Sequence, residues 1–77
     1  SAKFITAFFR NPAIKEQVEK LLNENHVRRK LSSMVQNDRY TEVIYEISMS
    51  AAQQRLAAAV KALPGVKTVS LVDCRNS

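Results

Sequence analysis

The residues that could do chemistry are few and lie far apart along the chain. The sequence holds one histidine, His26, and one cysteine, Cys74. Enzymatic catalysis needs a nucleophile beside a base, paired acids or a bound metal, which a lone histidine and a lone cysteine do not provide. Asp38 falls in an expected turn and Asp73 at the end of an expected strand, where each serves local turn or solvation chemistry. We therefore expect no catalytic residues, no metal ligands, no cofactor and no enzymatic activity.

The composition indicates one small globular domain. Residues 1–77 suit a single core, and the apolar run at residues 4–9 is too short to cross a bilayer. A single thiol cannot form an internal disulfide, which fits a reducing, cytoplasmic compartment. Because the chain starts without Met and with an apolar stretch, we expect a domain of a longer protein. Any membrane tether would then come from a preceding segment.

The first half of the sequence predicts a strand followed by a helix. Residues 3–10 fit either a strand or a helix end, and their three Phe and β-favouring residues favour the strand. Asn11-Pro12 is a typical helix start, with a capping Asn and Pro at the first helical position. Apolar residues at helical spacing then predict a helix over 12–24, and its buried stripe is Ile14, Val18, Leu21 and Leu22.

A β-hairpin is predicted next, from residues 27–35 and 41–49. Val27, Leu31 and Val35 are expected to share the core face of the first strand. The second strand alternates more clearly, with Val43, Tyr45, Ile47 and Met49 on one face. Superposing the two apolar faces pairs Leu31 with Tyr45 and Lys30 with Glu46, and a one-residue slip would bury Lys30.

The remaining residues predict a second helix and a last strand. Ser50 and Gln53 form a capping box for a helix over 51–63, and Pro64-Gly65 stops that helix before a strand at 66–74. The order β-α-β-β-α-β, with right-handed crossovers, predicts an α+β fold. We expect a ferredoxin-like sandwich with a four-stranded antiparallel sheet of order 4-1-3-2 and both helices on one face.

An apolar cluster is expected on the sheet face that the helices leave uncovered. Its members are Phe4, Phe8, Ile44 and Val72. RNA-binding sheets of this topology stack bases on aromatics of the first and third strands, but here the third strand offers Ile44 between Glu42 and Glu46, whose carboxylates repel phosphate. We therefore expect a protein partner, either a second copy or the rest of a longer chain, and rank nucleic acid second.

The run Arg28-Arg29-Lys30 is the sequence's only cluster of charge. Strand alternation places Arg28 and Lys30 on the outer face and Arg29 toward the helices. Arg28 and Lys30 are candidate anion or RNA contacts, and the nucleic-acid alternative would use them together with the exposed Phe residues. In the second interpretation, which we favour, they are charges that block sheet extension at an edge, with Lys30 paired to Glu46.

Residues 55–73, RLAAAVKALPGVKTVSLVD, resemble the helix-PGV-strand ending of ACT-like regulatory domains. They are also similar to the C-terminal cytosolic domains of MgtC/SapB-type bacterial membrane proteins. The resemblance implies a non-enzymatic regulatory or protein-interaction domain that acts through its open sheet face or an edge strand. ACT domains that bind amino acids place Gly after the first strand, where this chain has Arg10-Asn11-Pro12, so no ligand-binding residues are carried over.

Two metal-dependent classes of the same topology fit the sequence less well. Metal-carrying domains present two thiols on the loop after the first strand, and that loop here has none. Small metal-dependent nucleases need an Asp closing the first strand, where this chain has Arg10.

Overall fold

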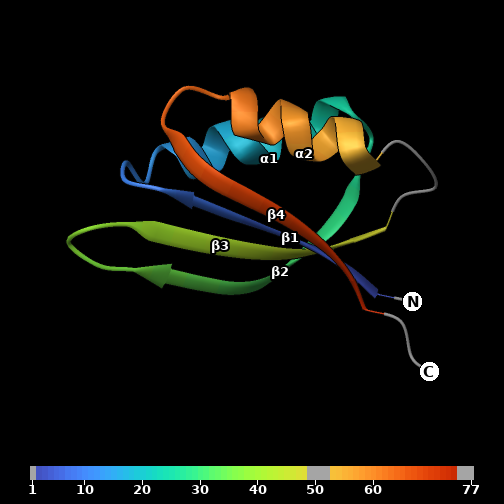
Figure 1. Ribbon diagram of the computed structural model, residues 1–77, viewed down its shortest axis with the longest axis horizontal. Helices are drawn as coiled ribbons and strands as arrows, with labels where there is room; N and C mark the ends of the chain where they lie inside the picture. The colour runs from blue at the N-terminus through green and yellow to red at the C-terminus, as the bar shows by residue number, and fades with distance from the viewer. Residues whose placement is uncertain (1, 49–52, 75–77) are drawn as a thin grey trace.

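The computed structural model describes residues 2–48 and 53–74 and folds them as a two-layer sandwich (Figure 1). The sheet has the order β2-β3-β1-β4, which is 4-1-3-2 counted from the other edge, and every neighbouring pair is antiparallel. Both helices lie on the same face of this sheet. The predicted ferredoxin-like βαββαβ fold is confirmed, including a strand at the ambiguous N-terminal segment. The elements are β1 (Ala2–Phe9), α1 (Ile14–Glu24), β2 (Arg28–Gln36), β3 (Thr41–Ser48), α2 (Gln53–Ala62) and β4 (Val66–Cys74).

The hydrophobic core fills the space between the helices and the sheet. In the central strands β1 and β3, alternate residues point into this space, as the period-two pattern predicts. The helices contribute their apolar stripes, and Leu21 at the margin of the α1 stripe is half-buried. The buried members include Ile5, Ala7, Phe9, Val43, Tyr45 and Ile47 from the strands and Ile14, Val18, Leu22, Leu56 and Val60 from the helices.

Helix α1 is held at both ends by local hydrogen bonds. At its start, the Asn11 side-chain oxygen accepts from the Ala13 N–H at 3.0 Å. Residues 12–13 form a turn, so the helix proper begins at Ile14 rather than at Pro12. At its end, His26 adopts a left-handed conformation with φ 56°. The N–H of His26 bonds to the Asn23 carbonyl and that of Val27 to the Leu22 carbonyl, the Schellman arrangement in which glycine usually takes the left-handed position.

The α2–β4 connection uses the chain's single glycine. Gly65 has φ 92°, a conformation that side chains with a Cβ rarely adopt, and a Cβ there would approach Ile14 Cδ1 to 3.2 Å. The predicted helix stop at Pro64-Gly65 is thus confirmed. The predicted capping box at the other end of α2 involves Ser50, which lies outside the described residues.

The β2–β3 hairpin follows the predicted register over only half its length. Lys30 pairs with Glu46 and Leu31 with Tyr45, as predicted. A bulge between Leu31 and Ser33 then inserts one extra residue and reverses the alternation of β2. Val35 consequently lies opposite Glu42, on the face away from the helices, so the prediction that it shares the core face of Leu31 is wrong.

Truncating the core at two distant points tests this packing. Leu56 is 3% exposed and Ile47 is 5% exposed, so Leu56→Ala and Ile47→Ala should each lower the free energy of unfolding by about 2–5 kcal/mol through lost burial and a residual cavity. Urea denaturation followed by circular dichroism measures this. Leu31→Ala is the control, because Leu31 is already 42% exposed. A loss at either core site no larger than at Leu31 would contradict the assigned core.

Candidate interaction surface

The face of the sheet opposite the helices, here called the open face, collects the alternate residues that do not enter the core. On β1 the buried residues are Ile5, Ala7 and Phe9, so Phe4 and Phe8 belong to the open face. Residues directly opposite each other in an antiparallel pair point to the same side. The strand register therefore decides which side chains become neighbours on this face.

The register brings the four predicted surface residues onto one face. Phe4 lies opposite Val72 of β4, and Thr6 lies opposite Ile44 of β3. Phe8, two residues beyond Thr6, takes the next position along the strand. Ile44 is thus the diagonal neighbour of both Phe rings, a separation that aromatic side chains can bridge. Phe4, Phe8 and Ile44 are half-buried and Val72 is 48% exposed, so the open face has an apolar centre.

Two further apolar residues, missed by the sequence analysis, enlarge this cluster. The Tyr40 ring packs against Phe8, with centroids 5.6 Å apart and planes tilted by 53°. The tight turn before β3 holds Tyr40 in place, since its N–H donates to the Asn37 side-chain oxygen at 3.0 Å. Tyr40 precedes Glu42 by two residues, so extending the alternation of β3 backwards would have found it. Val35 reaches the open face only because of the bulge in β2.

Carboxylates interrupt the apolar centre along β3. Glu46 lies opposite Phe4 and Glu42 lies opposite Phe8. Lys30 faces Glu46 across the β2–β3 pair, but no ion pair joins these two described side chains. The centre of the open face is therefore apolar with negative charge along one strand, while the positive charge sits at the β2 edge.

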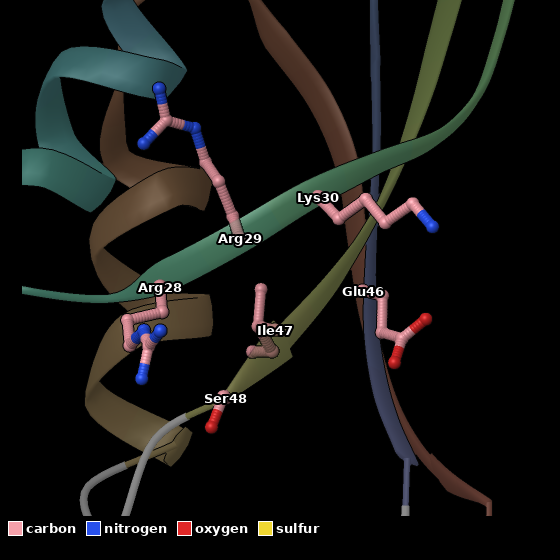
Figure 2. Close-up of a pocket in the computed structure, with 6 residues that line it drawn as sticks. All are labelled: Arg28, Arg29, Lys30, Glu46, Ile47 and Ser48. Atoms are coloured by element: carbon pink, nitrogen blue, oxygen red, sulfur yellow. The ribbon is translucent and has the colours of Figure 1, made fainter.

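The candidate anion contacts Arg28 and Lys30 line a shallow hollow at that edge (Figure 2). The hollow has a volume of about 230 Å³, and both side chains are exposed. Arg29 points instead toward α1, as predicted, where it donates to the Asn23 side-chain oxygen. The three cationic groups point in different directions and do not converge on one point. The hollow is lined by Arg28, Arg29, Lys30, Glu46, Ile47 and Ser48.

A half-buried polar cluster on the helix side of the sheet fixes α1 to β3. The Tyr45 hydroxyl donates to Glu19 Oε2 at 2.6 Å, and Lys15 Nζ lies 2.7 Å from the same oxygen. These two hydrogen bonds, from Lys15 first and then Tyr45, lower the pKa of Glu19. Burial, together with the bond to Glu19, raises the pKa of Tyr45. The polar groups of Lys15, Glu19 and Tyr45 bond to one another and are not directed at a cavity, so we assign the cluster a structural role.

The residues considered for chemistry stay apart in the structure. His26 is exposed at the α1–β2 corner, and Asp38 lies with Arg10 and Arg39 around a second hollow of about 410 Å³. Asp73 lies opposite Lys3 near the end of β4. Within residues 2–48 and 53–74, no group of three His, Cys, Asp or Glu side chains is placed to hold a metal ion.

No protein-family model matches the sequence, and the search of curated proteins gives no significant match. Among solved structures, the C-terminal domain of the MgtC protein from Mycobacterium tuberculosis is similar, with a TM-score of 0.60 and 17% identity over 92% of this chain and 84% of that one. The chain has the ferredoxin-like, ACT-like fold. A homoserine dehydrogenase from Thiobacillus denitrificans also matches, with a TM-score of 0.70 and 16% identity over 94% of this chain. This chain spans only 17% of the dehydrogenase chain.

These matches confirm the resemblance in fold that residues 55–73 predicted. At such low identities they establish the fold alone. Neither helix in the described part of the chain is long and apolar enough to cross a membrane.

The Tyr45–Glu19 pair predicts how stability depends on pH. The pKa of Glu19 is lowered in the folded state, so its contribution to stability is fully present above the ordinary glutamate pKa of 4.5. That contribution is lost as pH falls from 4.5 through the lowered pKa. The raised pKa of Tyr45 means that its contribution is present below pH 10, the ordinary tyrosine value, and is lost as pH rises further. Urea denaturation across pH should therefore show stability falling on both sides of neutrality.

Tyr45→Phe isolates the alkaline part of this dependence. The substitution should lower stability at neutral pH by about 1–2 kcal/mol, the worth of a hydrogen bond to a partly exposed carboxylate, and should flatten the decline above pH 10. Tyr40→Phe is the control, since the exposed Tyr40 packs by its ring. An alkaline decline that persists unchanged in Tyr45→Phe would contradict the assignment.

Proposed function

We propose that this chain is a non-catalytic regulatory or interaction domain and that its open face is the surface that contacts another protein. The observation that carries the proposal is the cluster of apolar side chains on the one sheet face without helices. Single exposed apolar residues are ordinary, whereas a contiguous cluster on a small domain marks an interaction site. The cluster comprises Phe4, Phe8, Val35, Tyr40, Ile44 and Val72.

The chemistry of the open face favours protein over nucleic acid. The two Phe rings could stack on bases, but Glu42 and Glu46 lie directly opposite them and would repel a phosphate backbone. Arg28 and Lys30 lie two strands away from β1, at the β2 edge. A protein surface with an apolar centre and a cationic group would satisfy the Phe cluster and the carboxylates together.

The comparisons support a domain that serves a larger protein. One similar structure is described as the C-terminal domain of MgtC, and the other match occupies a small part of a dehydrogenase chain. We extend the proposal to a regulatory domain on the cytoplasmic side, with any membrane tether supplied by a preceding segment. The partner surface is then the rest of such a protein or a second copy.

Substituting Phe8 tests the open face directly. In the isolated domain this face is accessible to a second copy, so self-association at high concentration, measured by sedimentation velocity, reports on it. Phe8→Ser should weaken that association by about tenfold or more, because contact energy concentrates in central aromatic residues. Met34→Ser is the matched control, since Met34 is 41% exposed and pairs with the core residue Val43 on the other face.

Circular dichroism of Phe8→Ser must show an intact fold, because Phe8 lies outside the core. An unfolded variant would place Phe8 in the core and contradict the proposed surface.

A double substitution, Arg28→Glu with Lys30→Glu, separates the nucleic-acid alternative. We expect it to leave self-association nearly unchanged, because exposed rim charges mostly affect association rates. Short single-stranded RNA and DNA, titrated by fluorescence anisotropy, should bind neither the native domain nor the variant. Binding by the native domain that weakens steeply with salt and disappears in the double variant would favour nucleic acid instead.

A further inference from the structure

The hollow beside Arg10 lies where the β2–β3 turn meets the end of β1. It has a volume of about 410 Å³ and is lined by Arg10, Asp38 and Arg39. Arg10 directly follows β1, while Asp38 and Arg39 belong to the turn that leads into β3. These two strands are neighbours in the sheet, with Phe9 opposite Thr41 at their paired ends. The sheet register therefore brings the three charged residues together from distant parts of the sequence.

The charged groups around this hollow are available to an external ligand. All three side chains are exposed, and within the described part of the chain none of them takes part in an ion pair or a side-chain hydrogen bond. Two guanidinium charges and one carboxylate charge leave the lining with a net charge of +1. The hollow at the β2 edge differs in this respect, because Arg29 there already donates to Asn23.

The backbone that carries the two arginines is fixed by local hydrogen bonds. In the turn, the Asn37 side-chain oxygen accepts from the N–H of Arg39 at 2.8 Å and from that of Tyr40 at 3.0 Å. The Asn37 N–H donates to the Tyr40 carbonyl oxygen at 3.0 Å. On the other side, Arg10 lies between the end of β1 and Asn11, whose side chain caps the turn into α1. Binding here orders side chains on a fixed backbone, which lowers its entropic cost.

The chemistry of this lining favours a carboxylate that belongs to a polypeptide. A planar guanidinium presents paired N–H donors that match either a carboxylate or a phosphate. The single charge of a carboxylate balances the net +1 of the lining, whereas a phosphate monoester brings about −1.5 to −2 at pH 7 and would meet Asp38. An acidic residue in a polypeptide also has backbone N–H groups nearby, and one of these can donate to Asp38.

The hollow adjoins the aromatic part of the open face. Tyr40 follows Arg39 directly in the chain, and its ring packs against Phe8 with the centroids 5.6 Å apart. A segment that places a carboxylate in the hollow can therefore lay a neighbouring apolar side chain on these rings. Protein interfaces commonly combine aromatic side chains with Arg in this way. Charge complementarity and the adjoining rings together select an acidic, partly apolar segment as the occupant.

We propose that Arg10 and Arg39 bind the carboxylate of an acidic residue in a partner protein, next to an apolar residue that covers Phe8 and Tyr40. This inference rests on the proposed function of the open face and names the chemistry of the segment that the face accepts. It also gives the two arginines a role that the cations at the β2 edge do not share.

Selection from a displayed library of random short peptides tests this chemistry. On the native domain, enriched peptides should carry Asp or Glu beside an apolar residue, and this enrichment should disappear on the double variant Arg10→Gln with Arg39→Gln. Arg28→Gln with Lys30→Gln is the matched control, because it removes the same charge from two exposed side chains at the β2 edge. The control should select the same peptides as the native domain.

An enriched peptide, synthesised with a fluorophore, gives the affinities by fluorescence anisotropy. Arg10→Gln and Arg39→Gln should each weaken binding by about tenfold or more, the effect of losing a charge-assisted hydrogen bond. Replacing the acidic residue of the peptide by its amide should weaken binding to the native domain similarly. The amide peptide should then bind the native domain and both variants alike, because the contact is already lost. This coupling distinguishes direct pairing from a general effect of net charge.

Four outcomes overturn the inference. These are a library without enrichment on the native domain, enriched peptides without an acidic residue, binding that ignores both arginine substitutions, and tighter binding when phosphoserine replaces the acidic residue. Peptides that depend on Phe8 but on neither arginine leave the proposed function standing. Peptides that depend on both arginines and bind Phe8→Ser unchanged count against the open face, while the carboxylate contact stands. Circular dichroism identifies misfolding, and if one arginine variant misfolds, the other decides.

Discussion

The strict alternation of side chains along β1 and β3 is the constraint on which the rest of this structure depends. These strands occupy the middle of the sheet, so their backbone groups are paired on both sides. One face of the pair is sealed by both helices and holds Ile5 and Tyr45 among the wholly buried residues. Because the period of a strand is two, sealing one face fixes the opposite face as well. The aromatic side chains of the open face are there because their neighbours on β1 are needed in the core.

The helix layer is attached to this central pair by apolar packing and by one polar contact. Tyr45 is 1% exposed, yet its hydroxyl reaches Glu19 on α1 and leaves no buried donor unpaired at that point. An unpaired buried hydroxyl would cost stability, so this contact favours one position of α1 over small sliding motions. Arg29, one of the three basic residues at the start of β2, also contacts α1, where it donates to the Asn23 side-chain oxygen. The three basic residues therefore lie on two faces of β2: Arg29 holds α1, and Arg28 and Lys30 are exposed on the other face.

Hydrophobic periodicity predicted the order of elements, the sheet order and the first half of the hairpin register. It succeeded at Leu31 and Tyr45 because a slip there would have buried Lys30. It failed at Val35, because nothing in a Ser-Ser pair distinguishes a regular strand from one with an inserted residue. It also missed the left-handed conformation of His26, because the residue that usually signals this conformation, glycine, is absent at that position. The surface residues Phe4, Phe8, Ile44 and Val72 could be placed on one face by parity alone, whereas the contact between Tyr40 and Phe8 depends on a turn whose geometry the sequence leaves open.

The bulge in β2 also bears on how such a domain can change over evolutionary time. Removing Ser32 would restore regular pairing along the whole strand, while Met34 would stay opposite Val43 on the helix side and Val35 would stay opposite Glu42 on the open face. Without the bulge, the same extra residue would shift the later part of the strand by one and exchange the faces of Met34 and Val35. The first half of the strand, with Arg29 and Leu31, would keep its register with β3. A single codon can thus be gained or lost at this position while the residues that each face displays, the core and the topology are inherited unchanged.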